Sequence, residues 1–171
     1  YEISTRDWSS DVCSSDLIGV PLQIVARISP FAADLFMVSV VAPVTEEIVK
    51  GLAVLFIFLL WRHEFDSLLD GIVYGSMVGF GYADSLLCLI PLRAFIFGLN
   101  HALYTSFIGL GFVAARFTRN QLLKIGYPLL GFFLAIFTHG VHNFFVSIGI
   151  LGLPIALLAD WMGIGILLII I

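Results

Sequence analysis

Long apolar runs separated by short polar connectors make up most of this chain. A helix needs about 20 mostly apolar residues to cross the hydrocarbon core of a bilayer, and several runs approach or exceed this length. The runs cover residues 44–61, 67–90, 92–117, 128–150 and 154–171, and an interrupted apolar stretch covers residues 17–42. The pattern predicts an all-α, polytopic integral membrane helix bundle with five to six transmembrane segments.

Pro43 divides the interrupted stretch from the first long run. Proline removes a backbone donor and leaves the carbonyl four residues earlier, at Ser39, without its helical partner. We therefore expect a helix break or kink at residues 42–44. A new helix should then run from about Val44 to Trp61.

Small residues recur in the run at residues 67–90. Glycine stands at every fourth position there, at Gly71, Gly75 and Gly79. This spacing forms a flat helix face, so we expect another helix to pack closely against it.

The composition supports a membrane protein rather than a soluble one. The chain has 171 residues, of which 60% are hydrophobic and 12% charged. A soluble domain is typically about half apolar and about one quarter charged. The apolar composition makes membrane lipid an expected partner. The net charge of −4 gives no sign of nucleic-acid binding.

The first residues do not share the apolar pattern. Residues 1–16 are rich in serine and aspartate and lack the basic and apolar regions of a signal peptide. They resemble the translation of a sequencing-adapter read-through, and a disordered polar tail is the alternative. We expect residues 17–171 to form a single transmembrane domain. The adapter interpretation implies truncation before it, and the end at Ile171, without a helix stop signal, predicts truncation there too.

Three ionisable residues interrupt the apolar sequence around Pro43. Glu46 and Lys50 are four positions apart, and Glu47 and Lys50 are three apart, so either glutamate can pair with the lysine on a helix. One lysine cannot fully neutralise two carboxylates. Because charged groups in hydrocarbon are costly, such residues indicate a functional site by default.

Histidines in two later runs extend this set. His101 lies in the run at residues 92–117, and His139 and Asn143 lie four positions apart on one face of the run at residues 128–150. His142 is close to that face but rotated. Each residue alone is more typical of a structural hydrogen bond. Together with the glutamates and Lys50, they indicate a functional site rather than separate structural contacts.

These residue types suit hydrolysis. A glutamate can act as general base on water, a histidine can share the proton, and an asparagine or neutral histidine can hold an oxyanion. Alternatively, Glu46, His101 and His139 could ligate a divalent metal such as zinc that activates the water. The chain has no HExxH motif, so the sequence leaves the cofactor open.

Three short motifs in order resemble those of the PrsW family of intramembrane proteases. They are "EEIVK" at residues 46–50, "FGLNH" at 97–101 and "HGVHN" at 139–143, with the Gly-rich "LDGIVYGSMVGFGYA" between the first two. The second and third also match a wider group that includes CAAX prenyl endopeptidases and bacteriocin-processing membrane enzymes. The resemblance implies an intramembrane endopeptidase of a bacterial or archaeal cell membrane. Its substrates would be single-span or membrane-associated proteins.

The resemblance also implies roles for individual residues. Glu46 matches the carboxylate that activates water, and Glu47 the glutamate that pairs with the basic residue, here Lys50. His101 matches the histidine that works with the base. His139 and Asn143 match the pair that supports the site or the oxyanion, with His142 beside them.

One position departs from the family pattern. Family members usually carry a Glu-Asn pair shortly after the Gly-rich run, whereas this chain has Asp84 and Ser85. Either Asp84 takes the place of that acid or the acidic position is lost. An inactive homologue, or a non-catalytic membrane scaffold or transporter-like protein, is therefore the alternative function.

Overall fold

The computed structural model describes the backbone of residues 29–84 and 91–170, and side chains at residues 29–81 and 99–169. Residues 1–16, for which we expect an artefact or a disordered tail, lie outside the described residues. The chain divides into two units, residues 1–37 and 38–171. In the first unit, helix α2 (Pro30–Phe36) begins after Ser29, whose hydroxyl accepts a hydrogen bond from the Ala32 amide.

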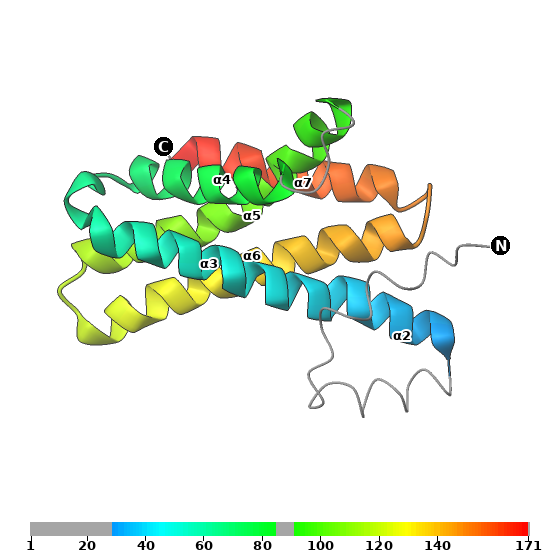
Figure 1. Cartoon of the computed structure of the whole chain (residues 1–171), viewed down its shortest axis with the longest axis horizontal. Coiled ribbons are helices and arrows are strands. Elements are labelled where there is room, and N and C mark those ends of the chain that lie inside the picture. Colours follow the sequence, from blue (N-terminus) through cyan, green and yellow to red (C-terminus); the bar gives the residue numbers. More distant parts are fainter. Residues whose placement is uncertain (1–28, 85–90, 171) are drawn as a thin grey trace. The chain divides into compact units, whose positions relative to one another are not determined.

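The described residues of the second unit form five long helices, shown in Figure 1. No strand occurs in the described residues, which confirms the all-α prediction. A 3-10 turn, η2 (Arg62–Glu64), follows the first long helix. The five are α3 (Ala42–Leu60), α4 (Leu68–Asp84), α5 (Pro91–Phe117), α6 (Gln121–Ser147) and α7 (Leu153–Ile170).

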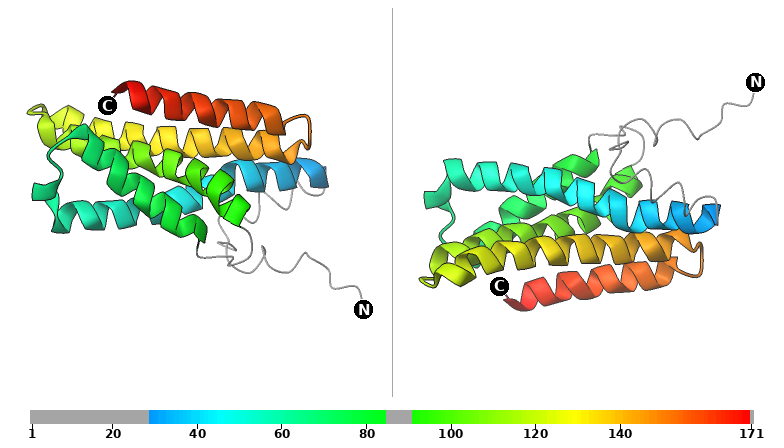
Figure 2. Two further views of the ribbon diagram at one scale, coloured as in Figure 1. Left: turned by 90° about the horizontal axis from the view of Figure 1, so that it is seen from above. Right: turned by 90° about the horizontal axis from the view of Figure 1, so that it is seen from below.

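Helix α5 lies at the centre of this unit. It packs along α4 and α6, and it also contacts α3 and α7. Helix α7 packs mainly on α6, as the two views of Figure 2 show. Side chains from α3, α5 and α6 can therefore meet inside the unit.

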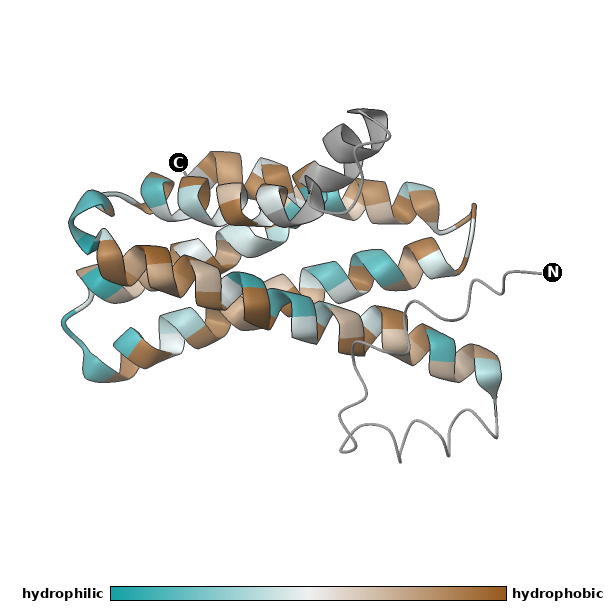
Figure 3. Ribbon diagram, in the orientation of Figure 1, coloured by the Kyte–Doolittle hydropathy of each residue, from teal (hydrophilic) through white to brown (hydrophobic). Residues whose placement is uncertain are grey.

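The outward surface of these helices is apolar. Large side chains such as Leu52, Phe56 and Phe133 are more than half exposed, which suits contact with lipid. Figure 3 shows hydrophilic residues within α3 and α6 between more hydrophobic stretches. Within the described residues, α6 is the one helix that is both long and apolar enough to span a bilayer on those two criteria alone. Shorter apolar helices cover Leu68–Gly81 and Leu153–Ile169.

The break that we expected at residues 42–44 is not where the structure places the distortion. A π-helical turn, η1 (Met37–Val41), leads directly into α3, so the wider turn comes before Pro43. Pro43 lies in the first turn of α3, where a helix needs no amide donor. The Ser39 carbonyl packs against α6, because a Cβ atom added to Gly140 would come within 2.5 Å of its oxygen.

Helix α6 begins earlier than we expected. Asn120 caps it by accepting a hydrogen bond from the Leu122 amide, and Pro128 lies inside the helix. The connector between α5 and α6 is therefore only residues 118–120. Hydropathy indicates where a helix meets lipid, and this helix continues beyond that boundary into polar sequence.

The glycine face of α4 packs on α5, as its spacing predicts. A Cβ atom at Gly75 would lie 2.5 Å from the Thr105 carbonyl oxygen, and one at Gly79 would collide with the His101 carbonyl. Only glycine permits these backbones to come so close. The face thus determines where α5 places the residues around His101 and Thr105.

Candidate active site

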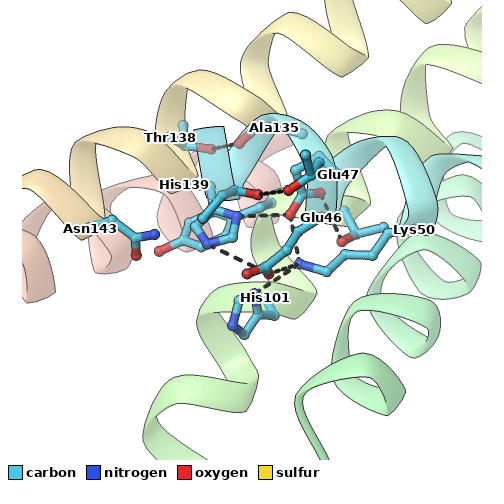
Figure 4. A network of polar contacts seen from close by, with 12 residues as sticks. Glu46, Glu47, Lys50, His101, Ala135, Thr138, His139 and Asn143 are labelled. Atoms are coloured by element: carbon cyan, nitrogen blue, oxygen red, sulfur yellow. Dashed lines mark hydrogen bonds and ion pairs between the residues drawn. The ribbon is translucent and has the colours of Figure 1, made fainter. Parts of the chain in front are cut away.

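Three helices bring five of the predicted site residues together. Glu46, Glu47 and Lys50 lie near the start of α3, His101 lies on α5 and His139 lies on α6 (Figure 4). One possible ligand atom each from Glu46, His101 and His139 lie within 4.8 Å of one another. Residues far apart in the sequence thus share one polar cluster inside the helix bundle.

Lys50 is the hub of this cluster. Its ammonium nitrogen Nζ lies 2.7 Å from Glu47 Oε1, 3.2 Å from Glu46 Oε2 and 3.0 Å from His101 Nδ1. An ammonium group has three N–H donors, and each of these atoms can accept one. The side chain is almost fully buried, so these partners replace the water that a charge needs.

The two glutamates have different surroundings. Glu47 is fully buried, and its Oε1 also faces His139 Nδ1 at 3.0 Å, while its Oε2 accepts a hydrogen bond from the Thr105 hydroxyl at 3.2 Å. Glu46 has a side chain that is 27% exposed. Glu47 is therefore enclosed by fixed partners, whereas Glu46 can be reached from outside the cluster.

These contacts determine which ring nitrogen carries the proton in the neutral form of each histidine. A carboxylate only accepts hydrogen bonds, so His139 donates to Glu47 through Nδ1–H. Its Nε2 atom then carries a lone pair, 4.0 Å from Glu46 Oε2. His101 accepts from Lys50 at Nδ1, so its neutral ring carries the proton on Nε2. The two rings meet edge to face, with centroids 4.9 Å apart.

The donor set suits a divalent metal in part. Two histidines and a carboxylate are typical ligands of catalytic zinc. His139 is already oriented by a carboxylate at its other nitrogen, as metal-bound histidines usually are. His101, however, uses one ring nitrogen to accept from Lys50 and carries a proton on the other. It could ligate a metal only after the Lys50 hydrogen bond is broken.

Sequence comparison assigns the chain to a known protein family. The sequence model of the "PrsW family intramembrane metalloprotease" matches residues 17–85 and 83–171. The chain belongs to this family. It is therefore a helical membrane protein, as the hydrophobic pattern predicts.

Two curated relatives are called "Protease PrsW". The protein from Geobacillus kaustophilus is 33% identical over 111 residues, which cover 60% of this chain and 48% of the relative. The protein from Oceanobacillus iheyensis is 33% identical over 102 residues, which cover 54% of this chain and 46% of the relative. The chain thus spans about half the length of these relatives. No solved structure matches it.

The two segments matched by the PrsW family model meet at residues 83–85. Asp84 and Ser85 lie here, near the position at which the resemblance leads us to expect a Glu-Asn pair. The backbone of Asp84 ends α4, but its side chain lies outside the described residues. A supporting role for Asp84 stays a prediction.

The structure gives Asn143 and His142 other partners. The Asn143 side-chain amide donates to the Val38 carbonyl in the π-helical turn, with a distance of 3.0 Å. His142 Nδ1 lies 2.7 Å from Asp160 Oδ2 on α7. Among the described contacts, neither residue bonds to the cluster around Lys50, although both lie within one turn of His139. Their supporting roles stay predictions.

Three further residues beside the cluster were missed in the sequence. Thr105 bonds to Glu47, and Tyr104 bonds to Asp160 and stacks on His139. Asp160 carried a usable signal, because it is the one acidic residue in the last apolar run. Tyr104 and Thr105 carried none, since both are ordinary residues of membrane helices.

Proposed function

We propose that this chain forms the catalytic part of an intramembrane endopeptidase that hydrolyses single-span or membrane-associated protein substrates. The observation that carries the proposal is the contrast between the glutamates. Glu47 is buried with fixed partners, while the neighbouring carboxylate of Glu46 is 27% exposed beside the same lysine. The relatives are bacterial, which supports a bacterial cell membrane as the location.

Glu46 is the general base in this proposal. Its carboxylate takes a proton from a water molecule as the water attacks the peptide carbonyl, and it returns the proton to the leaving amine. Lys50 holds Glu46 in place and is itself held by Glu47. His101 and His139 border the reacting water, and the N–H donor of the neutral His101 ring suits a developing oxyanion.

A metal-assisted form of the same reaction is the second candidate. The proximity of possible ligand atoms on Glu46, His101 and His139 favours it. A divalent metal held there would polarise the carbonyl and lower the pKa of a bound water. Glu47 would then orient His139, and His101 would have to release Lys50.

The test is a cleavage assay in liposomes with a panel of single-span substrates. Glu46→Gln should lower the rate by at least about 100-fold, because it removes the proton acceptor and keeps the side-chain shape. Glu64→Gln is the matched control, since its side chain is 58% exposed on η2, outside the cluster. Full activity of Glu46→Gln would refute the general-base role. Absence of cleavage by the unaltered chain across the panel would favour the scaffold alternative.

A further inference from the structure

A second buried polar group lies next to the candidate site, and it is centred on α7. The Asp160 side chain is 4% exposed, and both of its oxygens have partners. Oδ1 accepts a hydrogen bond from the Tyr104 hydroxyl at 2.9 Å, and Oδ2 lies 2.7 Å from His142 Nδ1. A carboxylate in this surrounding is costly unless it is well bonded. Helix packing alone does not require a buried carboxylate at this position of α7, so we expect a further role for Asp160.

Tyr104 connects Asp160 to the site. Its ring is 1% exposed and stacks on the His139 ring, with centroids 4.9 Å apart and planes inclined by 17°. The hydroxyl at the far end of the same ring is the group that Asp160 holds. Asp160 thus holds the far end of the ring that stacks on His139.

His139 needs such a contact to have a defined orientation. Its hydrogen bond to Glu47 fixes one ring nitrogen but still permits the ring to tilt about that bond. A flat ring packed against its face removes this freedom. The Nε2 atom of His139 is then held toward Glu46, at 4.0 Å from Oε2.

His142 fixes Asp160 to the same helix that carries His139. The two histidines are three positions apart on α6, so the His142 bond sets the position of Asp160 relative to α6. Tyr104 comes from α5, which also carries His101. A single carboxylate on α7 thereby bonds to one side chain from each of the two helices that carry the site histidines.

We propose that Asp160 is a positioning residue that orients His139 through the Tyr104 ring. The inference rests on the proposed function for its kinetic consequences, but the orientation of His139 can be measured without activity. The competing explanation is that Asp160 only ties α7 to the bundle. A tie would affect stability alone, whereas a positioning residue affects the rate constant kcat and the surroundings of His139.

The kinetic test uses Asp160→Ala, Tyr104→Phe and the double variant in the liposome assay. Phenylalanine keeps the stacked ring and removes the bond to Asp160, so Tyr104→Phe should reproduce the effect of Asp160→Ala. Each should lower kcat by about 10-fold with KM unchanged, as for other residues that orient a site residue. The double variant should be no slower than the slower single variant, because both changes break the same hydrogen bond between Tyr104 and Asp160.

Leu167→Ala is the matched control on α7. Leu167 is also buried and lies seven positions after Asp160 on the same helix. This change should lower the unfolding temperature in detergent and leave kcat unchanged. If Leu167→Ala reduces kcat as much as Asp160→Ala, or if the losses of Asp160→Ala and Tyr104→Phe multiply in the double variant, the proposal is overturned.

An NMR measurement separates this proposal from the proposed function. The tyrosine ring current should shift the Cε1 proton of a ¹³C-labelled His139 upfield, and His139→Gln assigns the signal by removing it. Asp160→Ala should move the signal toward its unstacked position, and Leu167→Ala should not. If Asp160→Ala does not fold, Tyr104→Phe gives the same comparison. An unchanged His139 signal overturns the proposal, even if Glu46→Gln abolishes cleavage. A changed signal with a fully active Glu46→Gln overturns only the proposed general base.

Discussion

Neutralising Glu47 should destabilise the protein far more than neutralising its neighbour Glu46. Glu47 is fully buried and bonds to Lys50 at 2.7 Å, His139 at 3.0 Å and Thr105 at 3.2 Å. Glu47→Gln keeps the shape but leaves Lys50 with less compensation and sets an amide among donors. Breaking a buried ion pair in this way costs about 3–5 kcal/mol of unfolding free energy.

The geometry places the expected loss near the lower end of that range. Lys50 keeps a second carboxylate, because Glu46 Oε2 lies 3.2 Å from its Nζ atom. Glutamine also keeps one carbonyl oxygen as an acceptor. We therefore expect Glu47→Gln to cost about 3 kcal/mol. Glu46→Gln should cost about 1 kcal/mol or less, because its side chain is 27% exposed and Lys50 retains Glu47.

The assay is equilibrium unfolding in mixed micelles, followed by circular dichroism, for both single variants and for Glu47→Gln combined with Lys50→Met. The double variant should recover about half of the loss, since it removes the buried charge that Glu47→Gln leaves behind. It should not recover cleavage, because Lys50 also holds Glu46 and His101. Equal losses for the two glutamine variants, or no recovery in the double variant, would refute the division into base and anchor.

Two further predictions concern the helix packing and the cofactor. Gly79→Ala should lower stability by about 1–3 kcal/mol and should also lower cleavage, because its Cβ atom would collide with the His101 carbonyl. Gly81→Ala is the control: a Cβ atom there would have nothing within 4 Å, so this change should alter neither property. Unfolding in micelles and the cleavage assay measure both effects. Cleavage should resist 1,10-phenanthroline while Lys50 occupies His101 Nδ1. Inhibition that added zinc reverses would instead favour the metal-assisted reaction.

The sequence predicted the ion pairs of α3 because ionisable residues are rare in apolar runs. Glu46, Glu47 and Lys50 stood out for that reason, and their spacing of three and four positions predicted the ion pairs that the structure contains. The glycine spacing predicted the packing of α4 for a similar reason, since the flat face that it forms depends on α4 alone. Local patterns were sufficient wherever the physical cause was local.

Partners from different helices could not be predicted in this way. Nothing in the order of residues indicates that Tyr104 on α5 meets Asp160 on α7, because that contact depends on how α5, α6 and α7 pack. The π-helical turn before Pro43 was also missed, since a proline predicts a disturbed backbone without specifying its form. Asn143 shares a helix face with His139, yet its amide bonds to the Val38 carbonyl of that turn.

The position of the site depends on helices that contribute none of the residues proposed to react. Charged groups in hydrocarbon must satisfy one another, so α5 and α6 have to pack on α3 before His101 can meet Lys50 and His139 can meet Glu47. Within that assembly, Gly79 on α4 permits the close approach of the His101 backbone. Because this contact sets a position rather than a charge, a change there should displace His101 without removing a charged group from the cluster. Variants on α4 should therefore perturb the geometry of the site while all of its charged groups stay present, which variants of Glu47 and Lys50 cannot do.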